Sequence, residues 1–572
     1  MKKITRLLCV FLAIAMLLSM VACGNTAEEK PVQTEGNVET VEKPEEVVAY
    51  DPMGAYEEAV TVEVGRPMED YGVEIPEGET YVDNSVLDYI KEKLNIDVEY
   101  TWEGVAYGEN YTRCLSLTIA SGEMPDILWI NDEDILRQLV ENDLVADLTD
   151  VYEQYASDLV KSTYAACASD VLGDRATYNG KLVALPNITY GGLDHFIHIR
   201  QDWVDALGLT LDEDGNHLIT REELEMVARA FVENDPGNSG DPVGISIHPY
   251  LNTDANTAFT SFNHPYGGYY RFWFEEDDGT VTSGSTTPET KEILGWWNHM
   301  YEEGLLDPQY GISAWDSILE MVTQNRLGII SGEVGAVSWM MNNAIAADPN
   351  AVFAASALDN GTGKTSWVEY DNINRWIVVS KECEHPEAAI KLLNLFAEMQ
   401  AHQKEIAAED SPLADLLNNQ EILYSNYYPL YLLSFLPTRS DYETIRDCLN
   451  GEMTYDELSL TAQRAYDVYK KYEEDPTSLT VEERIIYQNA ICACKVRVEL
   501  RENDLIDFVS PIYGITTDTM ASKLADLNKL EEETYVKIIT GEEPVDYFDT
   551  FVEEYNSRGG AAICEELAEI LH

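Results

Sequence analysis

The chain has 572 residues, which is too many for one hydrophobic core, so two or more domains are expected. Hydrophobic residues make up 45% and charged residues 25%, the balance of a globular protein, and after the N-terminal stretch no apolar run is long enough to span a membrane. The formal net charge of -67 at pH 7 repels nucleic acid and anionic lipid at long range, and it argues against polyanionic ligands unless the binding cleft is locally basic.

The first 22 residues are expected to be a signal peptide. Basic residues within positions 1–6 precede an apolar run over 7–18. The next segment, MVACG at 20–24, resembles the lipobox of bacterial lipoproteins, although Met20 stands where leucine is usual. The resemblance implies that residues 1–22 are removed and that Cys23 carries lipid. Ordinary secretion, with Cys23 as a bystander, is the alternative.

Residues 23–55 are expected to form a disordered tether. The stretch from Gly24 to Tyr50 contains seven glutamates, two prolines and few large apolar residues. It therefore cannot bury enough apolar surface to order itself. A flexible segment of this kind would hold a globular body away from a membrane.

Alternating strand and helix patterns begin the folded body. Val60 to Val64 alternates apolar and polar residues as a strand does, and Asn84 or Ser85 can cap the helical pattern that runs to Leu94. The β-α-β-α-β order implies a mainly parallel sheet that helices cover on both faces. The expected elements are strands over 60–64, 96–100 and 125–130, and helices over 84–94, 111–121 and 133–141.

The stretch from residue 184 to residue 209 is interpreted as a crossing between two lobes. Gly191 and Gly192 precede an extended run over 195–200, and a helix is expected to start at 201–207. Hinge segments are expected near 186–196 and 368–374. The predicted lobes are 56–190 with 370–410, and 191–369 with 411–572, the second including the C-terminal helices.

Capping residues mark later helix starts. Thr220 and Glu223 have the spacing of a capping box, and Thr287 followed by Pro288 is typical of a helix N-terminus. The remaining pattern predicts strands near 328–330, 334–340 and 376–380, a helix over 387–396, and mostly helical structure over 401–572.

A short motif resembles a known family. The segment ASGEMPDI at 120–127 is similar to a turn in the extracellular solute-binding proteins of ABC importers, the family that includes maltose- and oligosaccharide-binding proteins. The resemblance implies an α/β, two-lobe periplasmic-binding-protein-like fold, in which each lobe is a mainly parallel sheet flanked by helices and extra helices follow at the C-terminus. Further similar segments follow in family order at 182–209, 301–308, 328–340, 377–393 and 530–560.

The same resemblance implies a function. It implies a monomeric, lipid-anchored receptor on the extracellular face of the cell membrane, which traps a solute and delivers it to ABC permease subunits. An oligosaccharide is the expected solute, because sugar rings present flat apolar faces that suit the 10 tryptophans and 34 tyrosines. A peptide-binding or sensory receptor of the same fold, or an extracellular polysaccharide-active enzyme, is the alternative. Neither HExxH nor GxSxG occurs, so no enzyme is expected, and the strongly negative net charge argues against a nucleic-acid partner.

The ligand site is expected at the ends of strands and in loops. In an open parallel sheet ligands lie at the carboxyl ends of strands, which places Trp129, Asn131 and Asp132 near the solute. A core position for Trp129 is equally consistent with the pattern. Arg200 is a further candidate, with an ion pair to Asp202 as the structural alternative. The other predicted ligand residues are Trp102, Trp315, Trp339, which matches the place of a tryptophan in sugar-binding relatives, and Trp367.

A calcium loop is a weak possibility. Asp212, Asp214, Asn216 and Glu223 stand at ligand positions of an EF-hand loop. His217 occupies the position that requires glycine, so an acidic turn without metal is favoured. No other cofactor is expected.

Overall fold

The computed structural model describes residues 51–68, 78–102, 109–131, 133–167, 170–189, 195–249, 257–369, 372–408, 413–414, 427–430, 441–512 and 514–572. The predicted signal peptide, Cys23 and most of the predicted tether lie outside these residues. None of the described helices combines the length and the apolar character that a membrane span requires.

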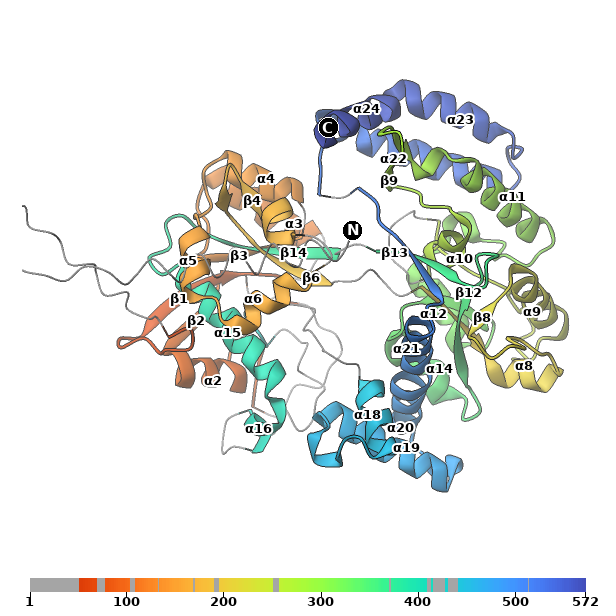
Figure 1. Cartoon of the computed structure of the whole chain (residues 1–572), viewed down its shortest axis with the longest axis horizontal. Coiled ribbons are helices and arrows are strands. Elements are labelled where there is room, and N and C mark those ends of the chain that lie inside the picture. The colour runs from red at the N-terminus through yellow and green to blue at the C-terminus, as the bar shows by residue number, and fades with distance from the viewer. Residues whose placement is uncertain are drawn as a thin grey trace, which may run out of the picture. The chain divides into compact units, whose positions relative to one another are not determined.

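Five strands form the first sheet in the order β2-β1-β3-β14-β6 (Figure 1). β1 is parallel to β2 and β3, whereas β14 is antiparallel to both β3 and β6, so one strand of the sheet is reversed. The apolar residues of β1 are buried and Thr61 and Glu63 are exposed, as the alternating sequence predicts. The bounds are β1 (Val60–Gly65), β2 (Ile96–Tyr100), β3 (Ile127–Ile130), β6 (Leu185–Thr189) and β14 (Asn372–Val379).

Helices pack on the first sheet and share one hydrophobic cluster with it. The Asn84 side chain accepts hydrogen bonds from the Val86 and Leu87 amides, so the predicted cap of α2 is confirmed. Tyr427 and Tyr428 also belong to this cluster. The helices are α2 (Ser85–Leu94), α3 (Glu109–Ser121), α4 (Glu133–Glu141), α5 (Thr149–Tyr155), α6 (Asp158–Ala165), α7 (Val171–Ala176), α15 (Glu387–Ala401) and α16 (Gln403–Ala408).

A buried asparagine joins α15 to its neighbours. The Asn394 Nδ2 donates to the carbonyl oxygens of Pro52, at 3.1 Å, and Tyr155, at 2.7 Å. Its Oδ1 accepts from the Ser157 amide at 2.9 Å. The side chain is fully buried, so these bonds replace the water that it loses on folding.

The second sheet has the order β11-β7-β12-β8. β7 is antiparallel to β11 and β12, and β12 is parallel to β8, so this sheet also has one reversed strand. All five residues of β7 are buried, as expected of a central strand. A β-carbon at Gly328 would lie 2.5 Å from the Trp203 ring, so this close approach requires glycine. The bounds are β7 (Phe196–Arg200), β8 (Leu218–Ile219), β11 (Ile329–Gly332) and β12 (Phe353–Leu358).

Helices from two parts of the sequence surround the second sheet. The predicted capping box of α9 forms at Thr220 and Glu223, and Thr287 caps α11. The helices near this sheet are α8 (Gln201–Leu207), α9 (Arg221–Asn234), α11 (Pro288–Glu302), α12 (Trp315–Thr323), α13 (Ala336–Trp339) and α14 (Asn342–Ala347). The C-terminal helices α22 (Asp518–Ile539), α23 (Tyr547–Tyr555) and α24 (Ala561–Leu571) lie together, and α22 packs against α11 (Figure 1).

A helical insert packs beside the second sheet (Figure 1). It consists of α18 (Asp441–Asn450), α19 (Leu460–Glu474), α20 (Val481–Ile486), a π-helix (Tyr487–Ala493) and α21 (Cys494–Glu502). After it, β15 (Ile506–Val509) pairs in parallel with β13 (Thr365–Val368).

The chain crosses from one sheet to the other where the sequence predicts. β6 belongs to the first sheet and β7 to the second, and the chain returns between β12 of the second sheet and β14 of the first. The interpretation of residues 184–209 as a crossing is therefore confirmed, whereas the ranges assigned to each lobe stay a prediction.

The strand predicted over 334–340 is wrong. The chain turns after β11, and Ala336–Trp339 forms the short helix α13, in which the Met340 amide donates to the Ala336 carbonyl at 2.7 Å. Helical spacing buries Ala336, Val337 and Met340 on one side and leaves Trp339 exposed.

Candidate functional site

Arginine side chains cover a tryptophan in the central strand of the first sheet. Trp129 of β3 is 2% exposed, and the guanidinium carbons of Arg66 and Arg375 lie 4.8 and 5.2 Å from its ring centroid. Arg66 also donates to the carbonyl oxygen of Tyr428. Trp129 is thus a core side chain in this structure, the alternative that its sequence left open.

Two other predicted ligand residues lie near Trp129. Trp102 follows β2 and is half-buried, with its ring 5.9 Å from Tyr111 at an interplanar angle of 74°. The Tyr111 hydroxyl donates to the Trp129 carbonyl at 2.5 Å. Asn131 directly follows β3 and is exposed. These residues gather at the carboxyl edge of the parallel strands, and Asp132 lies outside the described residues.

Trp315 and Trp339 form an aromatic platform on the second sheet's side. Their ring centroids are 5.4 Å apart with an interplanar angle of 16°, so the rings are stacked. Trp339 is 41% exposed, and Trp315 is half-buried. The platform joins two predicted residues that are 24 positions apart, and it leaves apolar ring surface open to solvent.

The turn between β11 and α13, the helix that contains Trp339, is hydrogen-bonded to β7. Gly332, the last residue of β11, pairs with Phe196, the first residue of β7. In the turn that follows, the Glu333 carbonyl accepts a hydrogen bond from His198 Nε2 at 3.0 Å. Burial lowers the pKa of His198 to about 4, so its ring is neutral at pH 7 and donates through Nε2.

Trp367 is a core residue in this structure. It lies in β13, is 1% exposed, and meets Phe196 at a centroid distance of 5.5 Å and an angle of 83°. Unlike Trp339, this ring has no exposed face.

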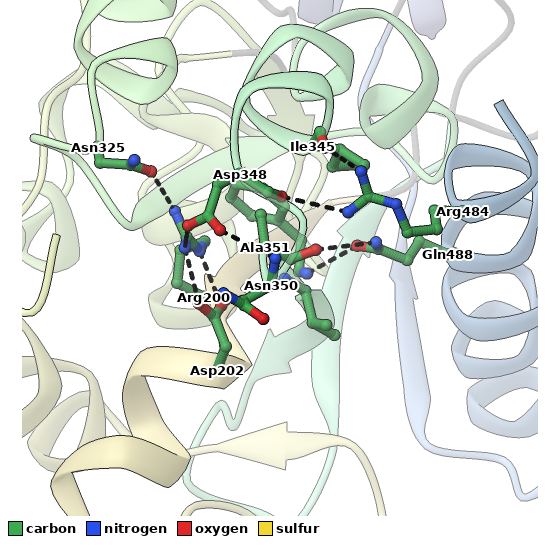
Figure 2. A network of polar contacts seen from close by, with 11 residues as sticks. Arg200, Asp202, Asn325, Ile345, Asp348, Asn350, Ala351, Arg484 and Gln488 are labelled. Carbon is green, nitrogen blue, oxygen red and sulfur yellow. Dashed lines mark hydrogen bonds and ion pairs between the residues drawn. The ribbon is translucent and has the colours of Figure 1, made fainter. Parts of the chain in front are cut away.

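Arg200 lies in a buried polar network (Figure 2). It is fully buried, and its Nε and Nη2 donate to the Asp202 carboxylate at 2.8 and 2.7 Å. Nη2 also donates to Asp348 at 2.9 Å, and Nη1 donates to Asn325 Oδ1 at 2.6 Å. This geometry favours the structural ion pair over a role in ligand binding.

The same network attaches the helical insert, a link that the sequence did not indicate. Arg484 of α20 donates to the carbonyl oxygens of Ile345 and Asp348 at 2.6 and 3.2 Å (Figure 2). Gln488 of the π-helix donates to the Ala351 carbonyl at 3.1 Å and accepts from the Phe353 amide at 2.9 Å. In the sequence both residues look like ordinary polar residues of a helix, so their role in attaching the insert is visible only from the tertiary contacts.

The oxygens of the candidate calcium loop face their own backbone. Asp212 accepts from the amides of Asn216, at 2.8 Å, and His217, at 2.9 Å, and Asn216 Oδ1 accepts from Leu218. Glu223 serves the capping box of α9, and Asp214 is exposed. Over the described ranges no three His, Cys, Asp or Glu side chains are grouped to hold a metal ion. Calcium binding stays a prediction.

The structure has two β-sheets, each flanked by helices, and the chain crosses between them. This architecture defines the class of two-lobe solute-binding proteins with a periplasmic-binding-protein-like fold. Residues 76–403 match the family model described as bacterial extracellular solute-binding protein, and the chain belongs to this family. The family resemblance seen at residues 120–127 and in the later segments is thereby confirmed. Proteins of this family are binding proteins that act outside the cell.

Curated relatives share most of the chain. The sequence is 20% identical to lipoprotein LipO of Bacillus subtilis (strain 168) over 482 residues, 83% of this chain and 86% of the relative. It is 23% identical over 489 residues to the polygalacturonan/rhamnogalacturonan-binding protein YtcQ of the same organism, covering 84% and 86% of the two chains.

The fold is also that of a solved solute-binding protein. It is similar to a structure described as an HMO-binding, ABC-transporter-associated solute-binding protein from Bifidobacterium longum infantis, with a TM-score of 0.60 and 16% identity. The match covers 89% of this chain and 98% of the solved one. The individual ligand residues stay predictions.

Proposed function

We propose that this protein is the substrate-binding lipoprotein of an ABC transporter, which captures an oligosaccharide in a cleft between its lobes and delivers it to a membrane permease. The observation that carries the proposal is the platform of Trp315 and Trp339. A stacked and partly exposed indole pair offers a rigid apolar plate, and a sugar ring can lie on such a plate while its hydroxyl groups remain hydrogen-bonded at the rim.

The comparisons support a carbohydrate ligand. YtcQ is described as a polygalacturonan/rhamnogalacturonan-binding protein, and the Bifidobacterium protein as an HMO-binding one. The net charge of -67 opposes the approach of an anion at long range, so a polyanionic sugar of the kind in the name of YtcQ would require a locally basic cleft, whereas a neutral oligosaccharide would not.

Capture would proceed by closure. The solute docks on one lobe, the segments around 186–196 and 368–374 bend, and the second lobe adds contacts that exist only in the closed state. Those additional contacts provide the free energy that favours closure. Lipid on Cys23 would hold the receptor at the extracellular face of the membrane, close to its permease.

A ligand screen followed by calorimetry tests this function. Thermal-shift assays with neutral oligosaccharides and with peptides should give a raised melting temperature with a sugar, because a ligand that binds the native state stabilises it by mass action. Trp339→Ala should then weaken binding of that sugar at least about tenfold, or about 1.4 kcal/mol.

Tyr455→Ala provides a matched control. Tyr455 is 39% exposed, close to the 41% of Trp339, and lies in a 3-10 helix between α18 and α19, where its hydroxyl donates to Asp467 at 2.9 Å. The control should bind as the wild type does. Unchanged affinity in Trp339→Ala would remove the platform from the site, and stabilisation by peptides alone would replace the proposed ligand class.

A further inference from the structure

A cavity separates the helical insert from the second sheet. Its volume is about 530 Å³, which is within the range of small-molecule sites. α18, α19, the π-helix and α21 form its walls, and Ala354 and Ala355 of β12 form part of its lining. Leu449 and Asn450, at the end of α18, line the cavity and are exposed, so they mark its opening.

Buried hydrogen bonds fix one wall of the cavity to the second sheet. Gln488 is 5% exposed, and its two bonds to the start of β12 fix the π-helix beside the strand (Figure 2). Tyr487 and Ile491 of that π-helix line the cavity. A π-helical segment often marks a functional position in a helix, because it costs stability relative to regular α-helix.

Three tyrosines give the cavity both ring surface and hydroxyl groups. Tyr442, Tyr469 and Tyr487 all line it. Tyr472 stacks on Tyr487 with the centroids 3.9 Å apart and an angle of 17°, which holds that ring in place. Burial raises the pKa of each of the three lining tyrosines, so their hydroxyls are protonated at pH 7.

Acidic partners already balance the basic groups of the cavity. Arg446 donates two hydrogen bonds to Glu502 at 2.7 and 2.9 Å. Glu499 lies 2.7 Å from His217 Nε2 and 3.7 Å from Lys495 Nζ. The paired charges favour a neutral ligand over an anionic one.

We propose that this cavity is a second carbohydrate site, which binds one or two neutral sugar rings between the helical insert and the second sheet. Tyrosine rings would contact the apolar sugar faces, and the tyrosine hydroxyls with the Asn450 amide would bond the sugar hydroxyls. The Tyr469 hydroxyl already donates to Glu473 at 3.2 Å, so it would accept a hydrogen bond from a sugar hydroxyl. The site is separate from the aromatic platform and does not require it.

Methyl NMR tests the proposal directly. The methyl groups of Ile445 and Ile491 line the cavity and report on its occupancy. Cellobiose, lactose and maltose are titrated into Trp339→Ala, in which the platform is removed. At least one of them should shift both methyl signals in a saturable way.

Leu449→Trp fills the opening from a residue that is already 39% exposed, so the fold is preserved. It should weaken the titration at least tenfold, whereas Leu571→Trp, at a leucine 37% exposed in α24, should leave it unchanged. The proposal is overturned if none of the three sugars shifts the signals, or if Leu449→Trp does not alter the shifts. Calorimetry on wild type and Trp339→Ala tests the platform separately, so either proposal can be refuted without affecting the other.

Discussion

Arg200, the last residue of β7, is a buried cation. It is fully buried, its guanidinium carbon lies 4.4 Å from the Trp203 ring centroid, and two carboxylates accept its hydrogen bonds. Removing one member of a buried ion pair leaves the other charge uncompensated, which makes the loss large.

Arg200→Met should therefore lower the free energy of unfolding by about 3–5 kcal/mol in urea denaturation. Asp202 and Asp348 would then face each other without a cation. The folded variant should retain its affinity for the ligand, because no part of the guanidinium is exposed. Arg464→Met is the control, since the Arg464 side chain is 40% exposed and pairs with Glu482, whose side chain is 58% exposed. If the Arg200→Met protein were stable but bound the ligand more weakly, Arg200 would be a ligand-binding residue.

Side-chain roles were the least predictable feature of the sequence. Trp129, Trp339 and Trp367 all lie near strand ends or in predicted strands, yet only Trp339 has an exposed ring. Burial of a tryptophan depends on which residues from distant segments cover it, such as Arg66 and Arg375 at Trp129. That information is absent from the local pattern.

Helix starts, in contrast, could be predicted from a few neighbouring residues. The capping box of α9 forms because the side chains of Thr220 and Glu223 each accept a hydrogen bond from the other residue's backbone amide. Thr220→Ala should destabilise the protein by about 1 kcal/mol, measured as a lower denaturation midpoint with an unchanged slope.

Ser522→Ala is the matched control for that loss. Ser522 is exposed within α22 and bonds only to carbonyl oxygens of its own helix, at 3.1 and 3.3 Å. Its replacement should change stability by less than about 0.5 kcal/mol. Equal effects of the two substitutions would show that the cap contributes nothing.

Strands were predictable where alternation is local, and the arrangement of strands was not. β1, β2 and β3 follow from short apolar patterns and the helices between them. The position of β14 between β3 and β6 is a contact between distant segments, which no local period encodes. α13 was missed for a related reason: residues 334–340 are mostly apolar, and so short a segment does not distinguish a period of two from one of 3.6.

Two buried histidines should make the free energy of unfolding of the whole protein depend on pH. His195, beside the crossing, and His264 lie with Nε2 and Nδ1 3.2 Å apart, and Tyr269 and Tyr270 surround His264. Burial lowers the pKa of His195 from 6.5 to about 3 and that of His264 well below 6.5. In the unfolded chain both rings take up protons below pH 6.5, whereas in the native state they stay neutral.

The unfolded state therefore binds more protons, and stability falls with decreasing pH. No penalty exists above about pH 6.5. Below it each histidine should cost up to about 1.4 kcal/mol per pH unit, until the pH reaches its folded pKa. His195→Gln should flatten the pH profile of the free energy of unfolding between pH 6 and pH 4, relative to wild type, as measured by urea denaturation.

His402→Gln is the comparison, because His402 is 53% exposed and should not alter the profile. Protonation of the many carboxylates acts equally in wild type and variant, so the difference between their profiles isolates the histidine. Parallel profiles for His195→Gln and wild type would contradict the expectation.

The central place of β14 has a consequence for biosynthesis. β3 and β6 leave the ribosome long before their shared neighbour does, since β6 ends at Thr189 and β14 begins at Asn372. At about 5–20 residues per second, roughly 10 to 40 s pass between the two events. During that interval the nascent N-terminal half has two strands with unpaired edges and cannot close its sheet. The delay makes any product truncated before Asn372 prone to aggregate, because the edges of β3 and β6 then stay open.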